Sequence, residues 1–455
     1  MFTREIYVER RRRLCERCGD GLLLLPGHVD SPVNYPDNCY RFRQDSTFLY
    51  YFGLDQPGLA AVVDADSGET TLFGDDQDVE AIVWTGPLPT LADRGAAAGV
   101  TRVRPLAALA EALAGREVHY LPPYRAETLL RLAELLLRPP AALRAGASPR
   151  FVHAVIAQRA FKGPEEIAEI EAAVAISVAM HEAAMSMVRP GMSEAEVAAE
   201  VERIALAAGG RVAYPVIATV RGEVLHNHGH KGTLAAADLF LLDAGAETAR
   251  GYAADLSSTF PVAPRFRGRQ RTLYELQLAA QAAAVAALAP GVPFVDVHFA
   301  AARVICDGMK ELGLLRGDTD EALAAGAHAI VFPCGVGHML GLDVHDMEDL
   351  GEDLVGWEGR DRSTQFGLKS LRLGRKLQPG FTVTIEPGIY FIPELIDLWR
   401  ANHHNAAYVD FAELEKWRDC GGVRNEEDFL ITGDGARRLG PSKPLTVADV
   451  EALRA

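Results

Sequence analysis

The first 160 residues alternate helical patterns with short apolar runs. Apolar residues recur at helical spacing in Glu5–Cys18, and the leucine-rich stretch Ala126–Leu137 has the same periodicity. This alternation is typical of an α/β layer domain, in which helices cover a sheet. No catalytic grouping stands out here, so we expect this half to shape or cover a site elsewhere. The apolar runs between the two helices are Gly21–Leu25, Thr47–Phe52, Ala60–Val63, Thr70–Phe73 and Ala81–Trp84.

A domain boundary is predicted near Phe161–Pro164. Pro164 and the glutamates after it suit the first turn of a long helix that runs to Met187. Ser193 and Glu196 then form the pattern of a capping box for the next helix. We therefore expect two domains, residues 1–160 and 161–455. Further predicted elements are strands at Val212–Val220, Leu239–Asp243, Phe381–Phe391 and Val423–Ile431, and helices at Arg271–Ala289 and Val295–Leu312.

Composition narrows the class of protein. Apolar residues make up 49% of the chain and charged residues 24%, which are globular values. A net charge of −16 excludes nucleic acid as a natural partner and favours cations. The leucine run Leu22–Leu25 is too short to span a membrane, and the basic N-terminus is not followed by an apolar signal segment. Six scattered cysteines do not form a disulfide framework, so we expect a soluble, cytoplasmic protein, and Arg11–Arg13 is interpreted as a solvated helix face.

Two acids stand in a predicted hairpin at Leu241–Pro261. Asp243 ends an apolar Phe-Leu-Leu run, and a turn-like segment separates it from Asp255. Burial of a lone carboxylate costs several kcal/mol or more, so a metal or a cationic partner is the natural compensation. The alternative is a pair of turn acids that flank the hairpin.

Four further segments place acids or histidines in strands or glycine-rich turns. Glu386 ends an alternating strand and is followed by Pro-Gly, and sites are commonly built at such strand ends. His338 follows Gly-Val-Gly, where glycines let the backbone approach a ligand closely. The four segments are His226–His230, Cys334–Asp346, Leu377–Phe391 and Gly421–Thr432.

Together these segments offer four carboxylates and one imidazole. This donor set suits two divalent ions of borderline hardness, such as manganese, cobalt or zinc, with carboxylates shared between them. Two such ions can activate water and polarise a carbonyl, so the set predicts a hydrolase. The candidate ligands are Asp243, Asp255, His338, Glu386 and Glu426.

The motifs DAGAE with YAADLSSTFP, GVGHMLGLDVHD, LQPGFTVTIEPGIYF and GGVRNEEDFLIT resemble metallopeptidases of the pita-bread fold, in the prolidase and aminopeptidase P branch. The resemblance covers Ala160–Leu439, and RFRQDSTFLYYFG resembles the creatinase-like N-terminal domain of that branch. It implies an α+β fold, with a pita-bread catalytic domain preceded by an α/β creatinase-like domain. It also implies two divalent ions per subunit, with manganese expected and cobalt or zinc as alternatives.

The resemblance further implies a role for each site residue. Asp255 and Glu426 would bridge the two ions, and Glu386 would also carry the proton from the attacking water to the leaving nitrogen. His226 and His345 would flank the scissile carbonyl. Arg424 would orient the metal carboxylates.

Two features depart from the family pattern. The interval from Asp243 to Asp255 is one residue longer than expected, and Asn425 replaces an aliphatic residue. Glu427 could be mistaken for the ligand next to it. We choose Glu426, because alternation from Arg424 puts it on the same strand face. His228 and His230 are interpreted as structural residues.

Substrate choice rests on two more residues. Arg372 resembles the prolidase arginine that pairs with the free carboxylate of a dipeptide, and an arginine fork suits a carboxylate. Trp84 resembles an aromatic residue that reaches the neighbouring subunit's site, with core packing as the alternative. We therefore expect a homodimeric Xaa-Pro dipeptidase that takes small peptides. The alternatives are an Xaa-Pro aminopeptidase for longer peptides and a non-catalytic pita-bread binding module.

Overall fold

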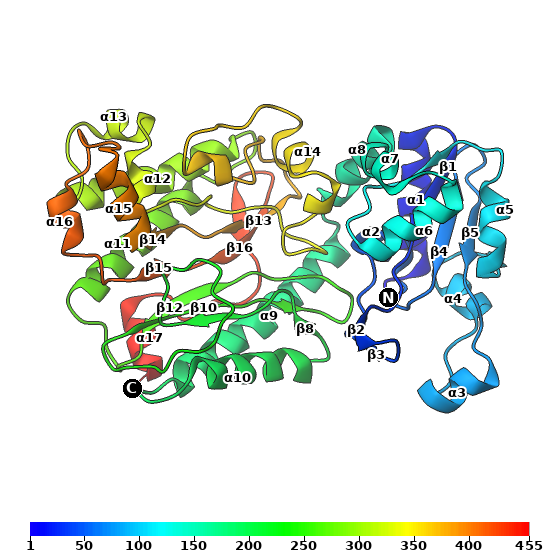
Figure 1. The fold of residues 1–455 in the computed structure, drawn as a ribbon, viewed down its shortest axis with the longest axis horizontal. Coiled ribbons are helices and arrows are strands. Elements are labelled where there is room, and N and C mark those ends of the chain that lie inside the picture. Colours follow the sequence, from blue (N-terminus) through cyan, green and yellow to red (C-terminus); the bar gives the residue numbers. More distant parts are fainter. Residues whose placement is uncertain (455) are drawn as a thin grey trace. The chain divides into compact units, whose positions relative to one another are not determined.

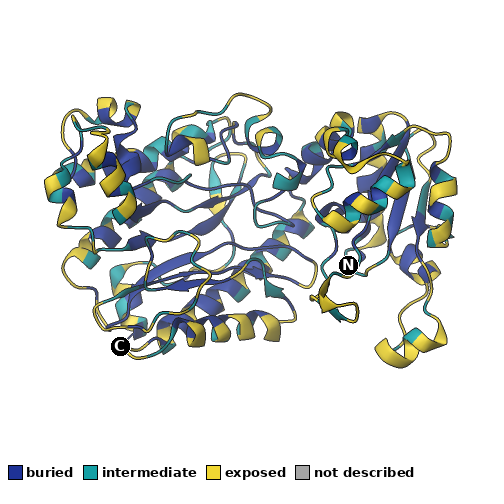
Figure 2. Cartoon of the chain, viewed as in Figure 1, coloured by how far each residue is buried: buried dark blue, intermediate teal, exposed yellow. Residues whose placement is uncertain are grey.

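The computed structural model describes residues 1–454, which fold as two compact units. Unit 1 comprises Met1–Ala160 together with Met347–Gly351, and unit 2 comprises Phe161–Asp346 and Glu352–Ala455. The central strands of each unit are buried, whereas the outer faces of helices are exposed (Figure 2).

Unit 1 contains a five-stranded sheet with helices packed against it, and a separate two-stranded sheet of β2 and β3 (Figure 1). The strand order of the five-stranded sheet is β6-β5-β4-β1-β7, with antiparallel pairing in the middle and parallel pairing at both edges. The strands of unit 1 are β1 (Leu22–Pro26), β2 (Pro32–Tyr35), β3 (Asn38–Cys39), β4 (Ala60–Asp64), β5 (Thr70–Phe73), β6 (Arg102–Arg104) and β7 (Val118–His119). Its helices are α1 (Arg4–Cys18), α2 (Ser46–Phe52), α3 (Val79–Thr85), α4 (Leu91–Ala97), η1 (Leu106–Ala108), α5 (Leu109–Leu113), α6 (Ala126–Leu136), α7 (Pro140–Ala145), α8 (Pro149–Arg159) and η3 (Glu348–Leu350).

Two of the apolar runs in unit 1 are short helices. The Asp45 side chain accepts a hydrogen bond from the Phe48 backbone N–H and so caps α2, which ends at Gly53 in a left-handed conformation. Asp78 caps α3 in the same way, through the Ala81 N–H. Neither run is long or periodic enough to predict a helix from the sequence. The capping residues determine that both runs are helical.

The interpretation of Arg11–Arg13 as a solvated helix face is wrong for Arg11. Its guanidinium is buried and donates to the backbone carbonyls of Tyr51 and Ala98. Arg12 and Arg13 are exposed and pair with glutamates of their own helix. Arg11 therefore ties α1 to α2, because its fork satisfies carbonyls that would otherwise be buried without a donor.

Unit 2 is built from small antiparallel sheets that lie between two pairs of helices (Figure 1). Helices α9 and α10 pack on the β8 to β11 side, while α11 packs on α12 and on β13 to β15. Its strands are β8 (Arg211–Val212), β9 (Ile217–Thr219), β10 (Leu239–Asp243), β11 (Ala246–Glu247), β12 (Ser257–Pro261), β13 (Thr382–Ile385), β14 (Gly388–Tyr390), β15 (Gly422–Arg424), β16 (Glu427–Ile431) and β17 (Ala436–Arg438). Its helices are α9 (Pro164–Met187), α10 (Glu194–Ala207), α11 (Arg269–Ala286), α12 (Phe294–Glu311), α13 (Thr319–Ala324), η2 (Ala327–Ile330), α14 (Glu352–Trp357), η4 (Leu368–Ser370), α15 (Pro393–Ala401), α16 (Phe411–Glu415) and α17 (Val447–Arg454).

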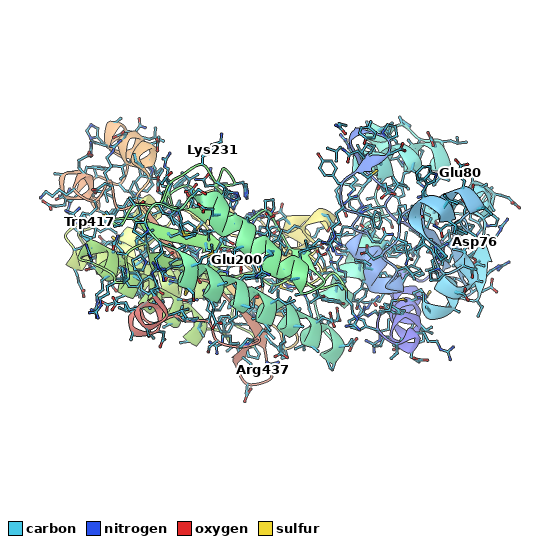
Figure 3. The ribbon with its side chains drawn as sticks, turned by 90° about the horizontal axis from the view of Figure 1, so that it is seen from below. Asp76, Glu80, Glu200, Lys231, Trp417 and Arg437 are labelled. Atoms are coloured by element: carbon cyan, nitrogen blue, oxygen red, sulfur yellow. The ribbon has the colours of Figure 1, made fainter. Side chains whose placement is uncertain are left out.

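The surface of unit 2 carries its charges on helix faces and turns. Glu200 of α10 pairs with Arg203 on the outer face, and Arg437 extends from β17 to Glu171 (Figure 3). The Arg269 guanidinium lies over the ring of Trp417, 5.0 Å from its centre. Helix α9 is long and apolar enough to cross a membrane, but half of its most apolar window is buried and it packs on α10 and α17. It therefore has the character of a core helix.

Candidate metal centre

The hairpin β10–β12 brings two acids to one end of its sheet. Asp243 is the last residue of β10, and its register partner is Ser257, the first residue of β12. Asp255 lies two residues before Ser257. The chain therefore brings Asp255 to the same end of the sheet as Asp243. Both side chains are buried.

Two more acids come from the second sheet system. Glu386 follows β13, and Glu426 precedes β16, which pairs with β13 in the register Ile385↔Glu427. The prediction that strand alternation from Arg424 places Glu426 needs correction. Strand β15 ends at Arg424 and β16 begins at Glu427, so Glu426 lies in the link between them. Glu427 pairs with Arg438 at 3.1 Å and points elsewhere.

His338 enters the cluster from a glycine turn beside β13. A Cβ on Gly337 would lie 2.1 Å from the Thr384 carbonyl oxygen, so only glycine permits this approach. The Thr384 N–H donates to the His338 carbonyl at 3.0 Å and fixes the turn against the strand. His338 Nδ1 lies 2.9 Å from the Met339 carbonyl, which leaves Nε2 to face the acids.

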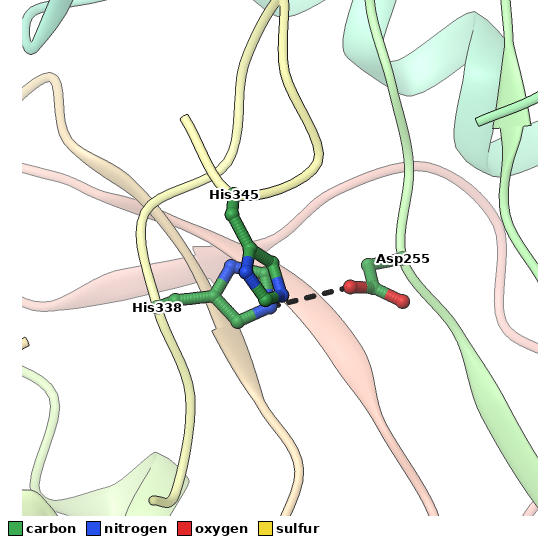
Figure 4. A group of neighbouring side chains, drawn as sticks. All are labelled: Asp255, His338 and His345. Atoms are coloured by element: carbon green, nitrogen blue, oxygen red, sulfur yellow. Dashed lines mark ion pairs between the residues drawn. The ribbon is translucent and has the colours of Figure 1, made fainter. Parts of the chain in front are cut away.

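The structure brings all five predicted ligands together. Their donor atoms form overlapping groups in which every atom lies within 4.8 Å of the others, and Asp255, His338 and Glu426 each belong to two groups. His338 Nε2 is 3.3 Å from Asp255, and its ring centre is 4.0 Å from that of His345 (Figure 4). The same nitrogen is 3.8 Å from Glu386. The groups are Asp255/His338/His345, His338/Glu386/Glu426 and Asp243/Asp255/Glu426.

The buried acids of the cluster repel one another when they are ionised. Glu426 is 1% exposed, and its Oε1 has no hydrogen-bond partner among the described residues. Burial, together with the charges of Asp255 and Glu386, raises the pKa of Glu426 well above its usual range. Burial also raises the pKa of Glu386 to about 7. Divalent ions would supply the missing positive charge, and this oxygen-rich set with one imidazole fits them.

The contact with Asp255 favours the protonated form of His338. Burial lowers the pKa of His338, but the hydrogen bond and charge of Asp255 outweigh burial and raise it to about 9. The same contact holds the pKa of Asp255 below its usual value despite burial. A metal ion would replace this proton, since a ligating imidazole is neutral.

Arg424 fixes one side of the cluster. Its guanidinium is buried and donates to Asp243 Oδ2 at 2.6 Å, to Ser257 Oγ at 3.0 Å and to the Tyr390 hydroxyl at 2.7 Å. The Ser257 hydroxyl in turn donates to Glu426 Oε2 at 2.8 Å. These contacts orient two of the carboxylates through a single cation.

Several positioning residues were not predicted from the sequence. The Tyr214 hydroxyl lies 2.7 Å from Asp243 Oδ1 and 2.5 Å from Asp255 Oδ1, so it contributes one proton between them. His181 is buried in α9 and contacts Ser258 Oγ at 2.8 Å. No sequence signal marks Tyr214 or His181, since both stand in ordinary apolar segments.

The departure at Asn425 is explained by packing, because its side chain donates to Gln277 at 2.6 Å.

A buried ion pair holds the turn that carries His345. Lys162 Nζ donates to Asp346 Oδ2 at 2.9 Å, and each side chain is 1% exposed. Asp346 is the neighbour of His345, and a Cβ on Gly341 would collide with the Asp346 carboxylate. The pair therefore sets the conformation of the His338–Asp346 turn.

The cluster opens into a cavity of about 460 Å³. His226, His345, Arg372 and Arg424 line it together with the four acids and the histidine of the cluster. His228 also lines it, although we interpreted this residue as structural. His230 does not, and its Nε2 contacts the Val216 carbonyl at 2.8 Å.

Trp84 is not among the residues that line this cavity. It belongs to α3 of unit 1, where its side chain is 80% exposed and no residue of the helix is buried. The alternative that Trp84 packs in a core is therefore wrong.

Residues 168–433 match the family model described as Metallopeptidase family M24, and residues 7–118 match Aminopeptidase P, N-terminal domain. The Xaa-Pro dipeptidase of Homo sapiens is 30% identical, and the alignment covers 99% of this chain and 93% of that protein. The Xaa-Pro aminopeptidase of Escherichia coli (strain K12) is also 30% identical, with 99% and 98% covered. The solved structure of Pseudomonas aeruginosa aminopeptidase PepP matches with a TM-score of 0.82 at 30% identity, over 100% of this chain and 98% of that one. The predicted resemblance and fold class are confirmed.

Proposed function

Because the chain belongs to metallopeptidase family M24 and is a metal-dependent Xaa-Pro peptidase, we propose that it is a prolidase that prefers dipeptides. The observation that carries the proposal is the position of Arg372, which lines the same cavity as the metal cluster. An arginine fork there would bind the free carboxylate of a dipeptide by two parallel hydrogen bonds. Proline makes the scissile bond a tertiary amide without an N–H, so this anchor would orient a substrate that offers few other polar groups.

We propose that Asp243, Asp255, His338, Glu386 and Glu426 hold two divalent ions, manganese first and cobalt or zinc as alternatives. Two ions are supported by the overlapping ligand groups, in which Asp255, His338 and Glu426 are shared, and each of the two shared carboxylates has two oxygens to offer. When bound, the ions supply an activated water and polarise the substrate carbonyl.

The other steps belong to side chains of this chain. Glu386 follows β13 at the cavity wall, where its carboxylate would take a proton from the attacking water and give it to the leaving nitrogen. His226 and His345 would donate hydrogen bonds to the carbonyl oxygen as its negative charge develops. Arg424 would hold Asp243 in place while the charge of the site changes.

An Xaa-Pro aminopeptidase for longer peptides is the second candidate. It is favoured by the solved structures, among which aminopeptidases P from three bacteria match with a TM-score of 0.82. In this case the carboxylate end of the cavity would remain open, and Arg372 would have no specific role.

We further propose a cytoplasmic homodimer in which residues 1–160 form the domain that completes the partner's site. The exposed apolar side chains of Val79, Val83 and Trp84 on α3 support this proposal, since such a cluster needs a cover. Trp84 would then contact the substrate bound to the partner.

The experiment compares hydrolysis of Gly-Pro and Gly-Pro-Ala by the manganese-loaded protein. We expect Gly-Pro to be preferred, and Arg372→Ala to raise its KM by about ten- to a hundredfold because a charge-assisted anchor is lost. Arg360→Ala is the matched control, since Arg360 is an exposed arginine of the same segment that pairs with Glu358.

Each outcome separates the candidates. Equal or better cleavage of Gly-Pro-Ala, unaffected by Arg372→Ala, would identify an aminopeptidase of the second kind. No cleavage of either peptide, with metal bound, would contradict both activities.

A further inference from the structure

The carboxylate of Glu352 lies between two arginines, one of which lines the cavity. Its Oε1 is 2.6 Å from Arg362 Nη1, and its Oε2 is 3.4 Å from Arg372 Nη1. Arg372 is the arginine that lines the metal cavity, whereas Arg362 and Glu352 do not line it. Glu352 thus contacts Arg372, the proposed substrate anchor, without itself lining the cavity.

Arg362 anchors Glu352 independently of Arg372. It donates to the Lys369 carbonyl at 2.9 Å and to the Leu371 carbonyl at 3.3 Å, so it is tied to the backbone that leads into Arg372. The Glu352 carboxylate is closer to Arg362 than to Arg372, so its contact with Arg362 is the stronger of the two. Its position is set by the first arginine, and its charge also acts on the second.

The segment that carries Glu352 is braced against the Arg372 segment. The Gly374 and Arg375 N–H groups both donate to the Gly356 carbonyl at 2.9 Å, and the Trp357 indole donates to the Leu371 carbonyl at 3.1 Å. A Cβ on Gly356 would lie 1.8 Å from the Arg372 carbonyl oxygen, so the two backbones are in direct contact. Helix α14 therefore holds the Glu352 carboxylate at a fixed distance from the anchor.

A glutamate carboxylate is the same chemical group as the C-terminal carboxylate of a dipeptide. We propose that Glu352 is a specificity-determining positioning residue that competes with the substrate carboxylate for Arg372. It holds the guanidinium at the cavity wall and lowers the positive charge that a bound carboxylate meets. It therefore weakens the binding of dipeptides and of the product proline alike, which speeds product release. This inference rests on the proposed function of Arg372.

A purely structural role makes a different prediction. If Glu352 only braces the segment through Arg362, its loss should affect all ligands to the same extent. If it competes with the substrate carboxylate, only ligands with a free carboxylate should respond. Gly-Pro and L-proline carry that group, whereas Gly-Pro-amide and prolinamide lack it.

The test is Glu352→Gln, which keeps an acceptor for Arg362 and removes the charge. We expect the KM for Gly-Pro and the inhibition constant of L-proline to fall about fivefold, from the energy of one charge pair at about 4 Å in water-like surroundings. The values for Gly-Pro-amide and prolinamide should not change. Asp353→Asn is the matched control, because Asp353 also accepts from Arg362, at 3.2 Å, and should change none of these constants.

A second comparison tests whether Glu352 changes the KM for Gly-Pro through Arg372. In an Arg372→Ala background, Glu352→Gln should have no further effect on Gly-Pro. A rise in the KM for Gly-Pro, an equal shift for the amide, or a full effect without Arg372 would overturn the competition.

Calorimetric binding of L-proline and prolinamide to the metal-loaded protein separates this inference from the proposed function. If no peptide is hydrolysed but Glu352→Gln still tightens L-proline selectively, the prolidase proposal fails and the role of Glu352 stands. If the variant binds L-proline no more tightly than the unaltered protein does, the role of Glu352 is refuted whatever the activity.

Discussion

Glu426 and Glu427 are adjacent acids with opposite environments. Glu426 is buried with one oxygen unpartnered and faces the metal cluster, whereas Glu427 pairs with Arg438 at 3.1 Å. The link between β15 and β16 turns the first into the cluster and the second away from it. One position along the chain thus separates a candidate metal ligand from an ordinary ion pair.

This difference predicts the outcome of a matched pair of substitutions. Glu426→Gln should lower metal affinity and activity by at least about a hundredfold, because it removes a shared anionic ligand. The metal-free variant should nevertheless melt at a higher temperature than metal-free wild type, since folding no longer has to protonate an acid whose pKa is raised by burial and by the charges of Asp255 and Glu386. Glu427→Gln should keep its metal. Elemental analysis and melting curves check both variants, and equal metal loss in the two would contradict the assignment of Glu426.

That the five candidate ligands lie together could be predicted, because each stands in a motif with a backbone reason for its place, such as the glycines before His338 or the strand end at Glu386. Tyr214 and His181 were not predictable, since their roles depend on where a side chain points after packing. For Glu426 the prediction chose the right residue for the cluster by a wrong argument, because the strand that was to supply the alternation ends at Arg424.

At the scale of elements, caps and long-range contacts account for the differences between prediction and structure. Strand β10 has the predicted bounds, because a continuous apolar run ending in an acid defines it. The run at Thr47–Phe52 is equally apolar, but Asp45 and Gly53 turn it into a helix. Arg11 is buried only because α2 presents free carbonyls to it. Such partners lie 40 residues or more away and leave no local signal.

Helix α12 and the turn η2 bring two histidines together in the core of unit 2. The rings of His298 and His328 are 6.0 Å apart, and their four ring nitrogens have no hydrogen-bond partner among the described residues. Burial lowers the pKa of His298 to about 3 and that of His328 to about 4. Both side chains are therefore neutral in the folded protein at neutral pH.

These pKa values predict acid lability. The unfolded chain takes up two protons as the pH falls below about 6.5, whereas the folded protein does so only near pH 4 and pH 3. The two histidines thus contribute stability above about pH 6.5 that is lost as the pH falls toward 4. His298→Gln should reduce the slope of unfolding free energy against pH by up to about 1.4 kcal/mol per pH unit.

Denaturant titrations between pH 4 and 7 measure this slope. His403→Asn is the control, because His403 is exposed in the same unit and has a left-handed backbone that asparagine tolerates. An unchanged slope in His298→Gln, or an equal change in His403→Asn, would contradict the role of the buried pair.

At the scale of the whole molecule, each unit has its own buried core and the metal cluster belongs to unit 2 alone. In unit 1, Asp20, Glu117 and His119 also lie close together, but Arg150 already donates to Asp20 and to His119 at 2.9 Å. A guanidinium thus already compensates the two acids of this small group, whereas in unit 2 Arg424 alone faces four carboxylates. Metal binding should therefore stabilise one unit and not the other.

Calorimetry of the full chain with and without a chelator tests this division. Metal at about a hundred times its dissociation constant stabilises the protein that binds it by about 2.7 kcal/mol, which raises the melting temperature of a unit of this size by roughly 5–10 °C. We expect chelation to shift the transition of unit 2 by that amount and to leave the transition of unit 1 in place. Glu426→Gln should abolish the shift, because the shared ligand is lost. Equal shifts in both transitions would mean that metal stabilises the chain through contacts outside the cluster.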